Sequence, residues 1–357
     1  MAVYYILYAC IFVTAACEMK WGSHDERAQK RDSIICFSLV ALILVLRHQS
    51  MGIDLEWTAS KGYLWMFDQA AGNSFADYLE VASKMHYEWF FKLYTWLLAQ
   101  VTGSRQVFMA VTALISLWPV AYLFFKKSCD PIMSWIIYLG MSPFLVLFSA
   151  LRQGMTIGLA VLLYILAEEK KIVPYIIVLA LAVLLHTSCV ILVVIYPAVN
   201  IRLGMKVRLA FVFLLLVAVF FRKWIMKLIA MAFPMYAKYL DYDQIVAYRL
   251  FAVFVLIYLF CCVFYDGSDL QNSYMNLFFP ACCCQFTGLF SQEIPREGFY
   301  FMPALCILLP SVIKGIEKKR LQVFLKAGTY ICFTVFGLYE LYDTVWTISY
   351  PYRFFWQ

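Results

Sequence analysis

The chain has 357 residues, of which 64% are hydrophobic and 14% are charged, and its net charge is +7. Polar breaks interrupt the apolar sequence about every 15 to 25 residues, which excludes a separate soluble domain. A charge of +7 would suggest nucleic acid in a soluble protein, but most Lys and Arg residues lie here in short loops beside apolar segments. Such residues set membrane topology. We therefore expect a membrane protein with no nucleic-acid partner.

Apolar runs bounded by charge predict about twelve membrane-spanning helices, within a range of about 10–14. In chain order these segments are Ala2–Glu18, Ser33–Leu46, Gln106–Phe125, Ile132–Ala150, Gln153–Ala167, Ile172–Leu185, Ser188–Ile201, Val207–Phe221, Ala247–Tyr265, Ser273–Phe290, Gly298–Ile313 and Leu321–Tyr342. Several are shorter than the ~20 residues of a perpendicular span, so tilted or re-entrant helices are expected among them. The first run lacks a basic n-region and a cleavage site, which indicates a retained span. The prediction is one all-α polytopic membrane domain over residues 1–357.

Lys and Arg in short loops predict the orientation of these helices. Five loops are predicted to be cytoplasmic because they carry Lys20, Arg27, Lys30 and Arg31; Lys126 and Lys127; Lys170 and Lys171; Arg202, Lys206 and Arg208; and Lys314, Lys318, Lys319 and Arg320. Successive loops then alternate between the two sides of the membrane on two conditions. Residues 88–101 must form a surface helix that does not cross the membrane, and the run Ile172–Ile201 must turn at His186. The loop Asp266–Asn272 is also assigned to this side, although it carries no Lys or Arg.

Under this topology both termini lie outside, and the outer face receives two long segments. Residues 48–105 form a long extracytoplasmic loop, and residues 222–246 form a basic, partly amphipathic loop expected to lie on the membrane surface. Arg152 reaches this face between two apolar runs, although a guanidinium at the bilayer centre costs about 3 kcal/mol or more. The same face also collects Arg47, His186 and Arg296. Any one arginine could simply reach lipid phosphate, but together these residues indicate a site for an anionic lipid substrate.

Five short motifs follow one another with a particular order and spacing. They are Arg47 with Gly52-Ile53-Asp54, Glu88-Trp89-Phe90, Arg152-Gln153-Gly154, His186-Thr187-Ser188 at the end of an apolar run, and Arg296-Glu297-Gly298-Phe299-Tyr300. In this order the chain resembles the EpsG-type, Wzy-like membrane proteins that polymerise exopolysaccharide repeat units. The resemblance covers nearly the whole chain, including an aromatic tail at Tyr350–Phe355. It departs at Leu55, where the family usually has an aromatic residue, and this puts the role of Asp54 in doubt.

The resemblance implies a GT-C-like glycosyltransferase in the bacterial cytoplasmic membrane, with its active site facing the periplasm or cell exterior. Such an enzyme moves a growing glycan from polyprenyl pyrophosphate to a sugar hydroxyl of another lipid-linked repeat unit. The product would be exopolysaccharide, capsule or O-antigen. The implied partners are the lipid-linked donor and acceptor and membrane lipid, with chain-length regulator and flippase proteins as further candidates. The resemblance implies no cofactor and no metal.

Arginine and histidine suit this chemistry. Arg47, Arg152 and Arg296 are expected to bind the leaving pyrophosphate, because guanidinium groups accept its charge through paired hydrogen bonds. His186 is expected to be the catalytic base, since a neutral imidazole can take the proton of the incoming hydroxyl, and Asp54 is the second candidate. Candidate substrate contacts are Gln153, Glu88, Glu293 and Tyr300. Glu88 could instead complement a helix N-terminus.

Other interpretations stay open at this point. The acidic pairs Asp54-x-Glu56 and Asp241-Tyr242-Asp243 could hold a divalent cation, and aromatic residues such as Tyr63 could stack on sugars. A flippase or transporter for the lipid-linked sugar would place polar groups near the midplane. A membrane O-acyltransferase would use a histidine base but has less need of three outer arginines. The twelve cysteines have no metal-site spacing and are expected to be small core residues.

Overall fold

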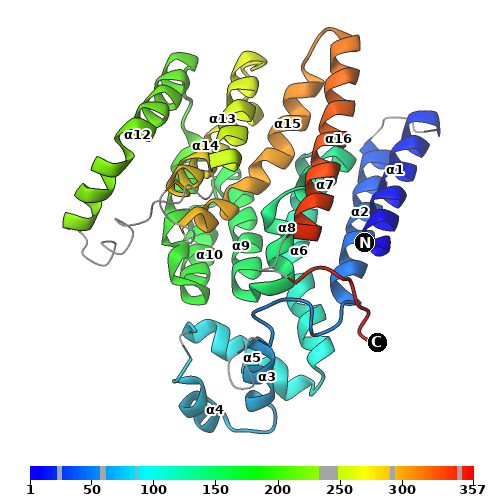
Figure 1. Ribbon diagram of the computed structural model, residues 1–357, viewed down its shortest axis with the longest axis vertical. Coiled ribbons are helices and arrows are strands. Elements are labelled where there is room, and N and C mark those ends of the chain that lie inside the picture. The colour runs from blue at the N-terminus through cyan, green and yellow to red at the C-terminus, as the bar shows by residue number, and fades with distance from the viewer. Residues whose placement is uncertain (22–25, 57–61, 86, 233–247, 290–293, 344–347) are drawn as a thin grey trace.

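The computed structural model describes all residues except 22–25, 57–61, 86, 233–247, 290–293 and 344–347. Its described residues form an all-helical bundle without β-strands, apart from an isolated bridge between Arg47 and Phe354 (Figure 1). The predicted all-α fold class is confirmed.

The described helices range in length from 3 to 28 residues. They are α1 (Ala2–Trp21), α2 (Glu26–Val45), α3 (Tyr63–Ala70), α4 (Phe75–Ala82), α5 (Trp89–Val101), α6 (Arg105–Lys127), α7 (Pro131–Leu139), α8 (Ser142–Ser149), α9 (Leu151–Glu168), α10 (Ile172–Leu185), η1 (Thr187–Val194), α11 (Ile195–Asn200), α12 (Met205–Ala232), α13 (Tyr248–Val263), α14 (Asp269–Thr287), η3 (Ile294–Tyr300), η4 (Met302–Ala304), α15 (Leu305–Lys314) and α16 (Lys319–Asp343). Here η marks a 3₁₀ helix.

Each of the twelve predicted segments falls on one to three of these helices. Within the described part, four helices are long and apolar enough to cross a membrane, and six are if two bent pairs each count as one span. The bent pairs are α7 with α8, at 60°, and the two parts of α12, at 84°. Four shorter apolar helices accompany them, in α1, α10, η1 with α11, and α13. The chain is thus a helical membrane protein, whereas the count of twelve spans stays a prediction.

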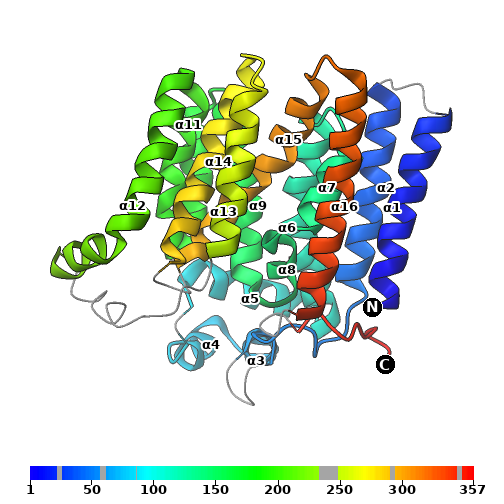
Figure 2. The ribbon, with the colours of Figure 1, turned by 45° about the horizontal axis from the view of Figure 1, so that its top comes forward.

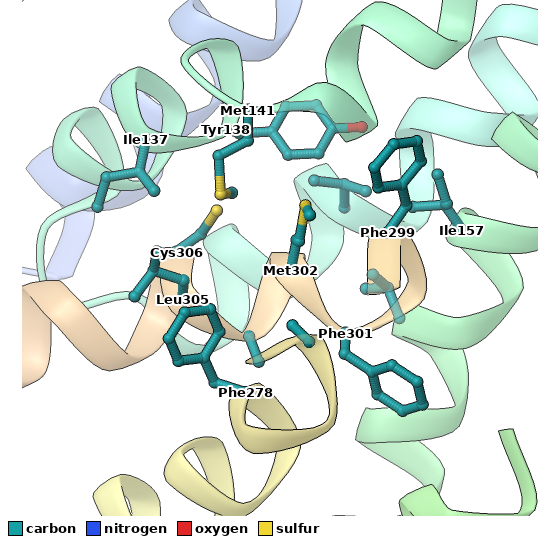
Figure 3. Packing of buried hydrophobic residues seen from close by; sticks show 14 of the residues in the cluster. Ile137, Tyr138, Met141, Ile157, Phe278, Phe299, Phe301, Met302, Leu305 and Cys306 are labelled. Carbon is teal, nitrogen blue, oxygen red and sulfur yellow. The ribbon is translucent and has the colours of Figure 1, made fainter. Parts of the chain in front are cut away.

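The centre of the bundle is α9, which packs against α6, α8, α10 and α11. Gly158 allows the close approach to α6, because a Cβ there would lie 2.9 Å from the backbone oxygen of Ser116. Beside α9, large side chains from distant helices fill the interior: Figure 3 shows Tyr138 of α7, Phe278 of α14 and Leu305 of α15 in one cluster. This packing holds the ends of α8, α9 and η3 in place around the site described below.

One end of the bundle is basic and carries the turns between long helices (Figure 2). Four ion pairs at this end join segments distant in the sequence: Lys126 with Glu169, Lys127 with Glu168, Arg202 with Asp269, and Lys326 with Asp130. Gln29 of α2 also donates to the backbone oxygen of Cys129 at 3.4 Å. The five loops predicted to be cytoplasmic therefore gather at one end. Asp269 brings the loop without basic residues to the same end. Arg208 is different, since it is fully buried and hydrogen-bonds Asn272 Oδ1 at 2.6 Å.

The opposite end carries α3, α4, α5 and both termini (Figure 2). A helix is present near residues 88–101, as predicted, and is α5; its place at the membrane surface stays a prediction. The helices α3 and α4 were missed, because eight-residue helices give little periodic signal. These three helices form a cap that packs on α6 and α10 and has its own apolar core, including Phe67, Phe91 and Phe108. The segment predicted as a surface loop from Arg222 is helical as far as Ala232, and its first part, Arg222–Leu228, makes an angle of 84° with Met205–Phe220. Residues 233–247 lie outside the described residues.

Candidate functional site

A cavity of about 290 Å³ opens between the cap and the ends of α8, α9, α10 and η3. Nine residues from distant parts of the sequence line it: Asp54, Tyr63, Tyr87, Ala150, Arg152, Gln153, His186, Arg296 and Glu297. Five of them belong to the predicted set of site residues: Asp54, Arg152, Gln153, His186 and Arg296. The structure therefore brings most of the predicted site together in one place.

The carboxylate of Glu88 lies between the side chains of Arg152 and His186, which both line this cavity. Its Oε2 forms an ion pair with Nη1 of Arg152. Its other oxygen, Oε1, lies 3.0 Å from Nδ1 of His186 and accepts a hydrogen bond from the backbone N–H of Thr187 at 3.1 Å. The side chains of Arg152, Glu88 and His186 are 16%, 19% and 27% exposed. We call these three residues the charged triad.

Each member of the charged triad stands at a helix boundary. Glu88 is the N-cap residue of α5, Arg152 lies in the first turn of α9, and His186 separates α10 from η1 in an extended conformation. The predicted turn at His186 is thus confirmed. The first N–H groups of a helix lack intrahelical partners, so the start of η1 supplies the Thr187 N–H that Glu88 uses. Three helix boundaries from distant segments meet here.

The surroundings of Glu88 have opposing effects on its pKa. Burial raises the pKa, but the hydrogen bond with His186, the charge of Arg152 and the Thr187 N–H lower it, and together they bring the pKa of Glu88 to about 2. Glu88 is therefore an anion at any physiological pH. An anion beside Nδ1 favours a proton on that nitrogen, which leaves Nε2 of a neutral imidazole as a hydrogen-bond acceptor.

Two tyrosines hold the guanidinium of Arg152. Its Cζ lies 4.4 Å from the ring centroid of Tyr87, within the range of a cation–π contact, and its Nε donates to the Tyr63 hydroxyl at 3.4 Å. The two tyrosine rings stack with centroids 5.3 Å apart. Nε and Nη1 use only part of the five N–H donors of a guanidinium. The remaining donors can serve a ligand in the cavity.

Asp54 reaches the cavity because its loop lies directly on the end of α8. Gly52 has a φ of +124°, and a Cβ there would lie 1.9 Å from the backbone oxygen of Phe148. Only glycine fits this approach. Two residues later, the Asp54 carboxylate accepts a hydrogen bond from Ser149 Oγ at 3.0 Å, and its backbone N–H donates to the same oxygen at 3.3 Å. The spacing Gly-x-Asp therefore has a structural reason here.

Gln153 connects the cavity wall to η3. Its Nε2 donates to the backbone oxygen of Arg296 at 3.0 Å, and Gln285 of α14 donates to the backbone oxygen of Pro295 at 3.3 Å. These two amides hold the chain on both sides of Arg296, whose own side chain is exposed. Gln153, predicted as a substrate contact, thus also positions η3.

Two predicted residues, Arg47 and Tyr300, lie away from the cavity surface. Arg47 is fully buried, donates from Nη1 to the backbone oxygen of Leu147, and lies 5.3 Å from the Phe148 ring centroid. The C-terminal tail covers it, since His48 N–H donates to the Arg353 oxygen at 2.9 Å. Tyr300 is buried behind the wall, with its hydroxyl 3.1 Å from Ser188 Oγ. Glu293 lies outside the described residues.

Of the two acidic pairs considered as metal ligands, the structure describes only Asp54 and Glu56. Glu56 forms an ion pair with Arg105 at 2.9 Å, away from the Asp54 carboxylate that lines the cavity. Asp241 and Asp243 lie outside the described residues. Within the described ranges, no three His, Cys, Asp or Glu side chains are placed together to hold a metal ion.

Tyr87, Ala150 and Glu297 line the cavity but were absent from the predicted set. Two of them had a signal in the sequence, because Tyr87 directly precedes Glu88 and Glu297 directly follows Arg296. Ala150 contributes through its backbone position at the end of α8, which side-chain chemistry does not reveal.

Comparison with known proteins identifies a family. A family model described as the EpsG family matches residues 33–354, a range that contains every residue lining the cavity. No curated protein and no solved structure matches the chain.

Proposed function

Because the chain belongs to the EpsG family, we propose that it polymerises polyprenyl-pyrophosphate-linked oligosaccharide repeat units into exopolysaccharide, capsule or O-antigen. The proposed reaction takes place at the outer face of a bacterial cytoplasmic membrane. The observation that carries this proposal is the charged triad, of which Arg152 and His186 line the cavity while Glu88 contacts both. It combines a fixed guanidinium, suited to a pyrophosphate, with an oriented imidazole, suited to an incoming hydroxyl.

In this proposal Arg152 and Arg296 bind the pyrophosphate of the donor. Negative charge grows on the pyrophosphate as the bond to the sugar breaks, and donors already held in place stabilise that charge without reorganisation. Tyr87 and Glu88 hold the Arg152 guanidinium in one orientation. Its planar fork can therefore present paired N–H groups to phosphate oxygens, which a lysine ammonium cannot.

His186 then acts as the general base. With Nδ1–H donating to Glu88, Nε2 takes the proton of the acceptor hydroxyl while the hydroxyl oxygen attacks the anomeric carbon of the donor sugar. The bond from that carbon to the pyrophosphate oxygen breaks, and its electron pair leaves with the pyrophosphate. Glu88 orients the imidazole and stabilises the imidazolium that forms, as the carboxylate does in a Ser-His-Asp triad. A single displacement of this kind inverts the anomeric centre.

Two other predicted residues receive supporting roles. Asp54 is the alternative base, and its hydrogen bond with Ser149 fixes it at the cavity edge. Arg47 donates to the last turn of α8 instead of lining the cavity. We propose that it positions the turn at Ala150 that leads into Arg152, rather than binding pyrophosphate directly.

The size of surface polysaccharide tests the proposal. In the source bacterium, the gene is deleted and complemented with the native protein, Arg152→Ala, or the control Lys126→Ala at the basic end. Loss of long chains in the deletion and in Arg152→Ala, with single repeat units accumulating at the outer face, is the expected result. Lipid-linked units trapped at the inner face would support a flippase instead. Full-length polymer lacking only acyl groups would support an O-acyltransferase.

A further inference from the structure

Three carboxyl groups lie at or beside the cavity, and they differ in their partners. Glu88 interacts with Arg152, His186 and the Thr187 N–H, and Asp54 interacts with Ser149. Glu297 also lines the cavity, and its buried Oε2 has no hydrogen-bond partner among the residues that the structure describes. Buried polar atoms are nearly always satisfied in folded proteins. The carboxyl of Glu297 therefore has a buried, unsatisfied acceptor beside the cavity, which a ligand hydroxyl can satisfy.

The backbone around Glu297 is held firmly. Gln153 and Gln285 bind the carbonyl groups of Arg296 and Pro295, on the N-terminal side. On the C-terminal side, Gly298 packs so closely on α14 that a Cβ would lie 3.0 Å from Cβ of Cys284. A carboxyl on such a segment keeps its place as a ligand enters. This is a property that a binding residue needs.

The position of Glu297 also relates it to the proposed base. The hydroxyl of Ser188, two residues after His186, contacts both the Glu297 carboxyl and the Tyr300 hydroxyl. Glu297 and His186 line the same cavity and interact electrostatically, so one acceptor sugar can reach both side chains. Successive side chains on a 3₁₀ helix point about 120° apart, so neighbouring Arg296 can face another part of the cavity.

We propose that Glu297 binds hydroxyl groups of the acceptor sugar and so presents one of them to His186. This inference rests on the proposed function and deepens it by naming an acceptor subsite. A carboxylate repels pyrophosphate, so it is unsuited to the donor phosphates that Arg152 and Arg296 attract. Sugar hydroxyls are neutral donors, and adjacent hydroxyls can donate together to the two oxygens of one carboxylate. Arg152 and Glu297 then divide the cavity into a donor side and an acceptor side.

Steady-state kinetics with separate donor and acceptor can test this division. The purified protein in nanodiscs receives radiolabelled lipid-linked repeat units as donor. The acceptor is the same oligosaccharide released from its lipid by mild acid, which cannot act as a donor. Glu297→Gln is compared with the native protein, with Glu297→Asp, and with Glu317→Gln, a matched control in an exposed turn at the basic end. Thermal unfolding of each variant is measured alongside.

The acceptor KM of Glu297→Gln is expected to rise about tenfold to a hundredfold, the range for losing a hydrogen bond to a charged group. Its donor KM and its kcat at saturating acceptor should stay near native values. Glu297→Asp should show a smaller rise, and Glu317→Gln none. A loss confined to kcat, or a higher donor KM, would overturn the acceptor role.

If Glu297→Gln unfolds, the test depends on Glu297→Asp, because aspartate keeps the charge. An unchanged acceptor KM in Glu297→Asp would then contradict the proposal. No transfer by the native protein would instead count against the proposed polymerase.

Discussion

Ion pairs occur at both ends of the bundle, but the two ends use them differently. At the basic end the exposure varies: Arg202 and Asp269 are 77% and 75% exposed, whereas Glu168, the partner of Lys127, is 11% exposed. At the cavity end, the carboxylate of Glu88 is 19% exposed and serves a guanidinium, an imidazole and a backbone N–H together. Exposed pairs contribute about 0–1 kcal/mol each, whereas burying charges costs free energy that their attraction often fails to recover. Charge content alone therefore does not identify a functional site. Charged side chains that share partners beside a cavity do identify one.

The largest effect should come from removing the imidazole at the cavity end. His186→Ala is expected to lower polymer formation by about 10²–10⁴-fold, the usual contribution of a general base. Binding of the donor should persist, because the arginines remain. Single-turnover assays and binding of labelled lipid-linked repeat units would measure the two properties separately. Native turnover by His186→Ala would transfer the role of base to Asp54.

Replacing the guanidinium while keeping its charge should have the next largest effect. Arg152→Lys is expected to lose about 10²–10³-fold in kcat, because an ammonium lacks the paired donors that stabilise the leaving pyrophosphate. The matched control at the basic end is Arg202→Lys, which should remain within about twofold of native activity, since exposed pairs contribute little. Both variants should accumulate in the membrane, as immunoblotting would show. Equal activities of the two variants would remove the distinction between the two ends.

Neutralising the shared carboxylate should have a smaller effect, because both of its partners remain. Glu88→Gln is expected to reduce activity by about 10–100-fold, as is typical when a residue that orients a functional histidine is changed. The matched control is Glu169→Gln, the partner of Lys126 at the basic end. Polymer assays on purified protein would compare them. Retention of native activity by Glu88→Gln would mean that His186 needs no orienting partner.

The low pKa of Glu88 predicts a pH-dependent contribution to stability. Its pKa is about 2 in the folded protein against an ordinary value of 4.5. A lowered folded-state pKa gives stability that is complete above the ordinary value and is lost as the pH falls toward the folded value. The difference in Tm between native protein and Glu88→Gln should therefore be constant above about pH 5 and shrink between pH 4.5 and 2. Thermal unfolding followed by tryptophan fluorescence would measure it. A constant difference down to pH 3 would contradict the ion-pair geometry.

The smallest effect on activity is expected for the cysteine substitutions of a topology test. This test asks whether the two ends of the bundle face opposite sides of the membrane. Exposed Cys17 and Cys332 are first replaced by serine. Ala76→Cys, on exposed α4 of the cap, should then react with an impermeant thiol reagent from outside. Lys318→Cys at the basic end should react only after the membrane is ruptured. Reaction of both cysteines from the same side would reject the predicted orientation.

Much of the fold follows from local features of the sequence. Apolar runs and charged breaks located the twelve helical segments, and the position of His186 between two short runs indicated a break there. Within the cap, by contrast, α3 and α4 went unpredicted. Helices of eight residues are unstable alone and depend on tertiary packing, here on aromatic residues such as Phe67 against Phe108. Local patterns are therefore informative for long apolar helices and weak for short ones.

By itself, the sequence determined the helical membrane class, the family, and most of the residues that line the cavity, because hydropathy and motif order are properties of short segments. Only the tertiary structure decided which of these groups meet. Glu88 contacts Arg152 and His186, Arg47 is buried under the C-terminal tail, and Glu297 lines the cavity. The physical reason is that each contact joins helix ends distant in sequence. The distance and direction between two such ends depend on how the bundle packs, which no single segment encodes.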